Sequence, residues 1–232
     1  MIRKIFLLFL LFFLSNELCP SPSISTGLDF GFNLINSSGL NKISEGLDEG
    51  YGTSFGRIRC PMTLMGSLSV GFGRSKIGIE FGYEFANSDS YSSIYSVTES
   101  LKYSALPVGV RYSYKIIDGS KWSLWSRIST GMMLTSFSMG TQPSVKTLDL
   151  AYESEAMAWY LSPALECIYT ATENIGFSMM FGARYANTSQ FRYNISDDRH
   201  DSGDYVVFSD GSNLTMNISG LKFSLGIILS WS

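Results

Sequence analysis

Few residues in this sequence have side chains suited to catalysis or metal binding. The only histidine is His200, and it lies among Asp197, Asp198, Asp201 and Asp204. Carboxylate oxygens are the ligands that calcium prefers, but the spacing is not that of an EF-hand loop. Covalent hydrolysis needs a nucleophile beside a base, and no paired serine motif, phosphate loop or zinc motif accompanies the histidine. We therefore expect a solvated acidic loop, with no metal, no cofactor and no enzyme activity.

The first residues are expected to be an export signal. A basic start precedes an unbroken apolar run from Ile5 to Leu14, and this run is too short to span a bilayer as a helix. Residues 1–23 are predicted to be a secretory signal peptide, cut between positions 15 and 25, and residues 24–232 to be the mature domain. Cys19 leaves a lipid-anchored start as an alternative.

Strand-like segments position the rest of the side chains. The chain of 232 residues is 45% hydrophobic and 16% charged, and its net charge of −3 gives no reason to expect a nucleic-acid partner. In "KIGIEFGYEF", from Lys76, the residues Ile77, Ile79 and Phe81 point one way, whereas Glu80 and Glu84 point the other. Eight segments of this kind occur along the chain.

The chemistry of the two faces decides between a soluble and a membrane β-protein. The apolar faces are large and aromatic and carry no charge, whereas the opposite faces are rich in Gly, Ser and Ala. A small polar face suits the crowded inside of a narrow barrel, and a large apolar face suits lipid. Closure also removes sheet edges, which lipid does not tolerate. The sequence predicts an all-β fold, an eight-stranded antiparallel up-and-down transmembrane barrel in the outer membrane.

The connections are predicted to alternate between short and long. Short periplasmic turns and long external loops are typical of such barrels, and this asymmetry places both termini on the periplasmic side. The short connections are expected at 74–76, 116–121 and 170–174, and the long ones at 36–61, 87–104, 136–155 and 186–218.

The last long connection still alternates and is expected to form a hairpin that projects beyond the membrane. An exposed apolar hairpin could bind partners, and a solvated, variable loop is the alternative. The alternating residues are Phe191, Tyr193, Ile195, Leu214, Met216 and Ile218.

Eight charged residues are predicted to lie inside the barrel. Buried charges are tolerated when they are paired and hydrogen-bonded, so we expect the four acidic residues to pair with the four basic ones as a structural plug. A functional ion path is the alternative. The residues are Asp29, Glu80, Glu84 and Glu166, and Arg111, Arg127, Arg184 and Lys222.

A second predicted interior feature is a small apolar pocket open to the outside. Pro107 and Pro163 lie within predicted strands, and because proline has no N–H for the ladder, they could leave a lateral gap to the lipid; a β-bulge is the alternative. The pocket residues are expected to be Met65, Met133, Tyr160 and Met180.

Two cysteines of the mature domain are predicted to stay free. Cys60 starts a strand near the outer surface, whereas Cys167 lies near the periplasmic end of another. They should be too far apart for a disulfide.

The chain ends in "SGLKFSLGIILSWS". In this segment Ser224, Gly226, Leu229 and Trp231 resemble the C-terminal assembly signal of outer-membrane barrels, with the usual terminal aromatic displaced by Ser232. In pattern, loop order and ending the chain resembles the small eight-stranded outer-membrane barrels, the group of OmpW, OmpX and the OmpA membrane domain.

This resemblance implies particular partners and functions. The expected partners are outer-membrane lipid, the outer-membrane assembly machinery, and a small hydrophobic solute or a host surface ligand. An OmpW-like passage of small hydrophobic molecules is the function that the pocket and the prolines favour. The alternative is a closed barrel that acts through its external loops as an adhesin or an envelope-structural protein.

Overall fold

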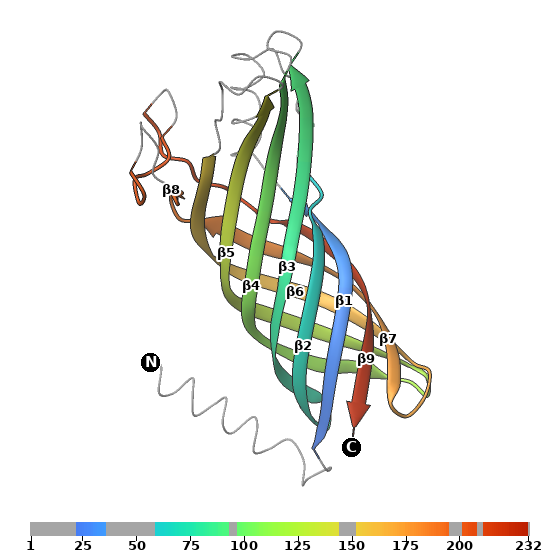
Figure 1. The fold of residues 1–232 in the computed structure, drawn as a ribbon. Helices are drawn as coiled ribbons and strands as arrows, with labels where there is room; N and C mark the ends of the chain where they lie inside the picture. Colours follow the sequence, from blue (N-terminus) through green and yellow to red (C-terminus); the bar gives the residue numbers. More distant parts are fainter. Residues whose placement is uncertain are drawn as a thin grey trace, which may run out of the picture.

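Eight of the nine strands that the computed structural model describes close into an antiparallel barrel (Figure 1). The structure describes residues 22–35, 59–92, 97–143, 152–194, 201–207 and 211–231. The strands are β1 (Ser23–Ile35), β2 (Met62–Phe72), β3 (Ser75–Ser92), β4 (Val97–Asp118), β5 (Trp122–Pro143), β6 (Tyr152–Thr170), β7 (Ile175–Thr188), β8 (Arg192–Tyr193) and β9 (Gly220–Trp231).

The barrel closes through two long-range pairings. Each strand from β1 to β6 pairs with the next in the chain, β7 pairs with β9, and β9 pairs with β1 from Ile24–Trp231 to Ile35–Gly220. The predicted eight-stranded, up-and-down barrel is confirmed. The remaining strand, β8, is a two-residue addition to the edge of β6.

The two ends of the barrel differ. The tight connections after β2, β4 and β6 lie at one end, together with the start of β1 and the finish of β9, and we call this the turn end (Figure 1). We call the other the loop end. β1 begins at Ser23, the last residue of the predicted signal peptide. Residues 1–21 of that peptide, with Cys19 among them, lie outside the described residues. The same holds for Ile195, Asp197, Asp198 and His200. Within the described ranges no helix is long and apolar enough to cross a membrane.

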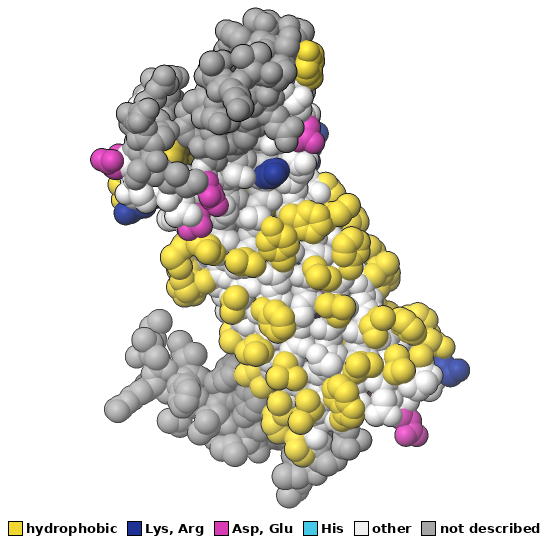
Figure 2. All heavy atoms as spheres, in the orientation of Figure 1, with side chains coloured by type: hydrophobic (Ala, Val, Ile, Leu, Met, Phe, Trp, Pro, Cys, Tyr) yellow, Lys and Arg dark blue, Asp and Glu magenta, His cyan; other side chains and the backbone are white. Residues whose placement is uncertain are grey.

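An apolar belt surrounds the outside of the barrel. Figure 2 shows hydrophobic side chains covering the middle of one face, with charged side chains only beyond its two edges. The alternation predicted for the membrane segments is confirmed, because outward residues such as Leu28, Phe81 and Val110 are 57%, 55% and 54% exposed. Such a continuous apolar surface requires an apolar environment around it.

Aromatic side chains border this belt at both ends. At the turn end the rings of Trp122 and Tyr169 lie 4.7 Å apart, and toward the loop end those of Tyr83 and Phe85 lie 5.8 Å apart. Amphipathic rings favour the level of the lipid headgroups. The belt therefore spans the region between these two aromatic levels.

The strands β3 to β6 continue past the belt, where the sequence predicts loops. The connections expected at 87–104 and 136–155 are largely strand, because β3 reaches Ser92, β4 starts at Val97, and β5 reaches Pro143. Above the belt the polarity of the two faces is inverted. Leu101 and Tyr103 point inward and are buried, whereas Lys102 between them is exposed. These extensions therefore follow the pattern of a water-soluble sheet.

A charge placed in the belt tests its contact with lipid. We expect Val110→Arg to lower the free energy of unfolding by about 2–4 kcal/mol, the range for an arginine at the bilayer midplane. The matched change Ser136→Arg, on an outward position just beyond the belt on β5, should cost less than about 1 kcal/mol. Urea unfolding in lipid vesicles measures both, and equal losses would contradict the belt boundary.

Candidate functional site in the barrel lumen

Glycines on the inner wall make room for large inward side chains. A Cβ at Gly82 would collide with Sδ of Met65, a Cβ at Gly109 with the hydroxyl of Tyr160, and a Cβ at Gly226 with the carboxylate of Asp29. Eight strands enclose only enough space for side chains or one small ligand. The small residues of the polar face therefore let the lumen be filled by Met65, Tyr160 and the charged groups.

Arg127 is the centre of the buried charges. Its Nη2 lies 2.5 Å from Glu80 Oε2, and its Nη1 lies 3.9 Å from Asp29 Oδ2 and 3.8 Å from Glu166 Oε1. The Ser129 hydroxyl also donates to Glu80, at 2.9 Å. One guanidinium on β5 thus joins carboxylates from β1, β3 and β6 across the lumen. Because its five donors form a rigid fork, arginine suits such a bridging position better than lysine.

A second ion pair lies nearer the loop end. Arg184 on β7 donates to Oε1 of Glu84 on β3, and this oxygen also accepts from Nδ2 of Asn33 at 2.8 Å. Nε and Nη2 of Arg184 donate to the backbone carbonyl of Ile218, at 3.3 and 3.2 Å. Arg184 therefore links the wall of the barrel to the connection between β7 and β9. We call this connection, described at 189–194, 201–207 and 211–219, the strap.

Two of the predicted charged residues do not pair as expected. All eight are buried, but Arg111 donates through Nε to the Ser69 hydroxyl at 2.9 Å. Among the described residues, no carboxylate lies within ion-pair distance of Arg111 or Lys222. The reason is that Arg127 engages three of the four carboxylates and Arg184 engages the fourth. We call the eight residues the charge layer. Apart from these two missing pairs, they lie together inside the barrel, as the alternation of their strands predicts.

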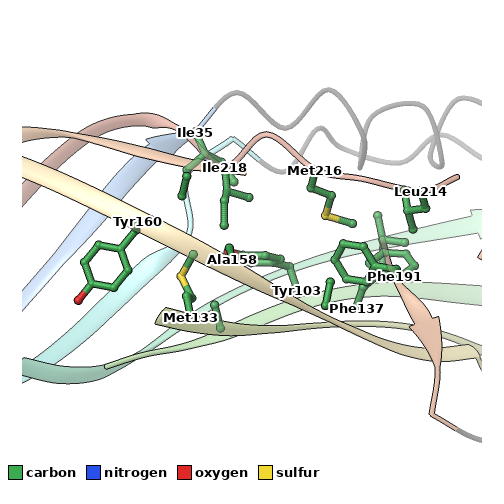
Figure 3. Close-up of a cluster of buried hydrophobic side chains, with 14 residues drawn as sticks. Ile35, Tyr103, Met133, Phe137, Ala158, Tyr160, Phe191, Leu214, Met216 and Ile218 are labelled. Atoms are coloured by element: carbon green, nitrogen blue, oxygen red, sulfur yellow. The ribbon is translucent and has the colours of Figure 1, made fainter. Parts of the chain in front are cut away.

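A hydrophobic cluster fills the lumen on the loop side of the charge layer (Figure 3). Its side chains come from β1, β4, β5, β6, β7 and the strap, and all are at most 7% exposed. We call this cluster the apolar plug. Its residues are Ile35, Leu101, Tyr103, Ala105, Met133, Phe137, Ala156, Ala158, Tyr160, Ala186, Phe191, Leu214, Met216 and Ile218.

The strap contributes four of these residues, and the expectation of an exposed hairpin was therefore wrong for them. Phe191, Leu214, Met216 and Ile218 are at most 1% exposed. Figure 3 shows Phe191, Leu214 and Met216 gathered beside Tyr103 and Phe137, well inside the wall. Alternation shows that one face of a segment is apolar but not what that face contacts. Here the apolar side chains inside the mouth of the barrel offer a large surface, and burying the strap residues against it is favourable.

Backbone hydrogen bonds hold the strap across the mouth. The amides of Thr188, Phe191 and Ile218 donate to the carbonyls of Met216, Leu214 and Ala186, each at 3.0 Å. Between Thr188, which pairs with Ala158, and Arg192, which pairs with Glu155, the strap has one residue more than β6. This extra residue reverses the alternation of the strap and turns Phe191 into the lumen.

The predicted pocket residues do not line an opening to the outside. Met65, Met133, Tyr160 and Met180 are 2%, 0%, 5% and 2% exposed. Met133 and Tyr160 belong to the apolar plug, whereas Met65 pairs with Asp29 and Met180 with Glu166, at the level of the charge layer. The hydroxyl of Tyr160 donates to Glu80 at 3.0 Å and so connects the two layers.

Each proline interrupts the hydrogen-bonded pairing of its strand with one of its two neighbours, and neither forms a β-bulge there. On β3 and β4 the pairing stops after Phe81–Val108 and resumes in the same register at Glu84–Ala105, leaving out Pro107. On β6 and β7 it stops after Leu161–Tyr185 and resumes at Ala164–Gly182, leaving out Pro163. Pro107 is buried, whereas Pro163 is exposed on the outer face.

A narrow vestibule leads into the lumen from the turn end. A cavity of about 240 Å³ lies there, lined by Lys76, Lys115 and Trp125 among others. The ammonium groups of Lys76 and Lys115 lie 4.5 and 5.3 Å from the centre of the Trp125 ring. Cation–π contacts of this kind hold the ring across the lumen below the charge layer.

The remaining predicted residues lie as follows. Ser224 and Gly226 face inward beside the charge layer, whereas Leu229 and Trp231 face outward and are 38% and 49% exposed. Cys60 and Cys167 are free. Among the described residues no group of three or more His, Cys, Asp or Glu side chains could hold a metal ion.

Comparison with known proteins shows the fold. No protein-family model and no curated protein sequence matches the chain. A major outer membrane protein from Thermus thermophilus is similar over 91% of this chain and 100% of its own, with 15% identity and a TM-score of 0.53. The fold is that of an outer-membrane barrel. OprG from Pseudomonas aeruginosa is similar over 90% of this chain and 95% of its own, with 12% identity and a TM-score of 0.52.

Removing one partner of the Arg184–Glu84 pair should be costly. We expect Glu84→Met to lower the free energy of unfolding by about 3–5 kcal/mol, because it leaves a buried, unpaired guanidinium. The double variant Glu84→Met/Arg184→Met should recover part of this loss. Urea unfolding in vesicles measures the free energy, and limited proteolysis of the strap measures its release. A single variant as stable as the native protein would contradict the pair.

Gly226 should tolerate no side chain, since a Cβ there would overlap Asp29 and lie 2.7 Å from the Ser178 hydroxyl. We expect Gly226→Ala to lower the free energy of unfolding by about 1–3 kcal/mol. Gly176→Ala is the matched control, because its Cβ would meet Ile168 Cγ2 at 3.2 Å, a contact that a small shift relieves. Thermal denaturation in detergent compares them, and equal stabilities would exclude the steric explanation.

Proposed function

We propose that this protein is an integral outer-membrane barrel that is closed to solutes and acts through the surface it presents outside the cell. In the orientation that we propose, the turn end is periplasmic, with the start of β1 and the end of β9, and β3 to β6 extend beyond the outer leaflet. The lipid of the outer membrane is its permanent partner. The outer-membrane assembly machinery is its proposed route of insertion.

The observation that carries the proposal is the filling of the lumen. The charge layer and the apolar plug follow one another along the axis, and every member of the two is at most 7% exposed. A path for ions would need hydrated space between paired charges, and a path for apolar molecules would need the space that Met133 and Tyr160 occupy. The extended sheet above the belt is the largest surface left for recognition, as adhesin or envelope-structural element.

One observation favours a second candidate, the sideways passage of small hydrophobic molecules. An apolar groove of about 980 Å³ lies on the outer face over β9, β1, β2, β3 and β4, with Gly82 and Leu106 in its lining. These two residues belong to the stretch where the ladder is interrupted by Pro107. From the inside the groove is closed by Met65, whose sulfur lies against Gly82.

Bilayer recordings distinguish the two functions. For refolded native protein we expect no single-channel current and no flux of apolar solutes. Arg127→Ala should also remain closed, because the apolar plug still seals the mouth. Only Arg127→Ala combined with Phe191→Ala and Met216→Ala should conduct ions.

Sustained solute flux through the native protein would overturn the closed-barrel function. If this flux rose further in Met65→Ala with no ion current, the sideways passage would replace it. If the native protein is closed, adhesion of cells that display it is the next measurement. Loss of adhesion in a variant with outward polar residues Asp89, Lys102 and Glu155 changed to serine would support the role of the extended sheet.

A further inference from the structure

An amphipathic cleft lies on the outside of the barrel where the apolar belt ends. Its volume is about 550 Å³. Its floor includes Leu134 and Met157, a cross-strand pair on β5 and β6 that is 41% and 49% exposed. The strap forms its opposite side through Gln190, Arg192 and Asn194.

The strap makes this cleft by adding β8 to the edge of β6. The Ser189 hydroxyl accepts from the Met157 amide at 3.1 Å, and the Asn194 amide donates to the Glu153 carbonyl at 2.9 Å. These bonds fix the polar segment directly beside the outermost apolar residues of the wall. The cleft is thus continuous with the lipid-facing belt below it and open to the polar surface above it.

Arg192 provides a positive charge that no described carboxylate pairs with. Its guanidinium lies 4.5 Å from the centre of the Tyr205 ring, and Nη2 donates to the Tyr205 hydroxyl at 2.6 Å. Glu155, directly opposite on β6, instead accepts from Asn194 Nδ2 at 3.2 Å. Within the described ranges no carboxylate forms an ion pair with Arg192. The ring orients the guanidinium, and among the described residues only Tyr205 accepts a hydrogen bond from it.

We propose that this cleft binds the uncovered phosphate of an anionic outer-leaflet lipid headgroup, with one acyl chain lying on Leu134 and Met157. The proposal rests on the proposed function, because it requires the belt in the membrane and the loop end outside. A lipid fits because only a membrane component meets an apolar floor that continues the belt. A phosphate fits because the guanidinium fork matches its oxygens.

Native mass spectrometry of the refolded mature protein in a neutral detergent tests the site. The probes are phosphatidic acid, phosphatidylcholine with the same chains, and inorganic phosphate as competitor. We expect the native protein to retain phosphatidic acid in preference to phosphatidylcholine. Arg192→Gln should weaken phosphatidic acid binding roughly tenfold, the effect of losing a hydrogen bond to a charged group. Met157→Ser should weaken it as well, and inorganic phosphate should not displace the lipid.

Arg74→Gln is the matched control, since Arg74 is an exposed arginine in the turn between β2 and β3 at the opposite end. It should bind phosphatidic acid like the native protein. Equal binding by Arg192→Gln, or no preference for phosphatidic acid, would overturn the proposal. Displacement of the lipid by inorganic phosphate would show a simple anion site and overturn the proposal too. So would a dimer of the protein in which a second copy occupies the cleft and no lipid is bound.

Conductance measured on the same preparation separates the two proposals. If the barrel is closed and Arg192→Gln binds phosphatidic acid like the native protein, only the lipid site is refuted. A conducting barrel that still prefers phosphatidic acid through Arg192 refutes the closed-barrel function alone.

Discussion

The pairing of β1 with β9 is the constraint on which the structure depends. It leaves no open edge in the wall, and in lipid an unpaired row of backbone groups has no water to satisfy it. Closure of eight strands also sets a narrow bore. Everything that points inward must then fit and be satisfied there, which explains glycine beside Met65, Tyr160 and Asp29, and a cation beside every buried carboxylate.

A single strand serves two environments in succession. On β4 the outward residues Leu106 and Val108 meet lipid, whereas a few residues earlier it is the inward residues Leu101 and Tyr103 that are apolar. Between these residues the period of two does not change, and only the environment outside the wall does. Below this level the barrel has a polar inside and an apolar outside, and above it the arrangement is that of an ordinary soluble β-protein. The apolar plug is the core of this upper part.

The limits of sequence-based prediction follow from the same alternation. The parity that places Arg111 inward also places Leu101 and Tyr103 inward, and that of Lys222 places Leu214, Met216 and Ile218 inward. Continuing the parity beyond the belt would therefore have found most of the plug. Phe191 has the parity of the outward residues of β7, and it lies inside only because of the extra residue before Arg192. The partners within the charge layer depend on positions around the barrel axis, which alternation does not contain.

The strap lies directly before β9 in the chain, and this order links the exclusion of water from the interior to the closure of the wall. This segment, the strap together with β9, supplies both the strand that completes the wall and the apolar side chains that fill its mouth. Without this segment β1 to β7 would form an open sheet, and water would reach the inner charges. Exclusion of water from around Arg127 therefore depends on the same segment that closes the wall.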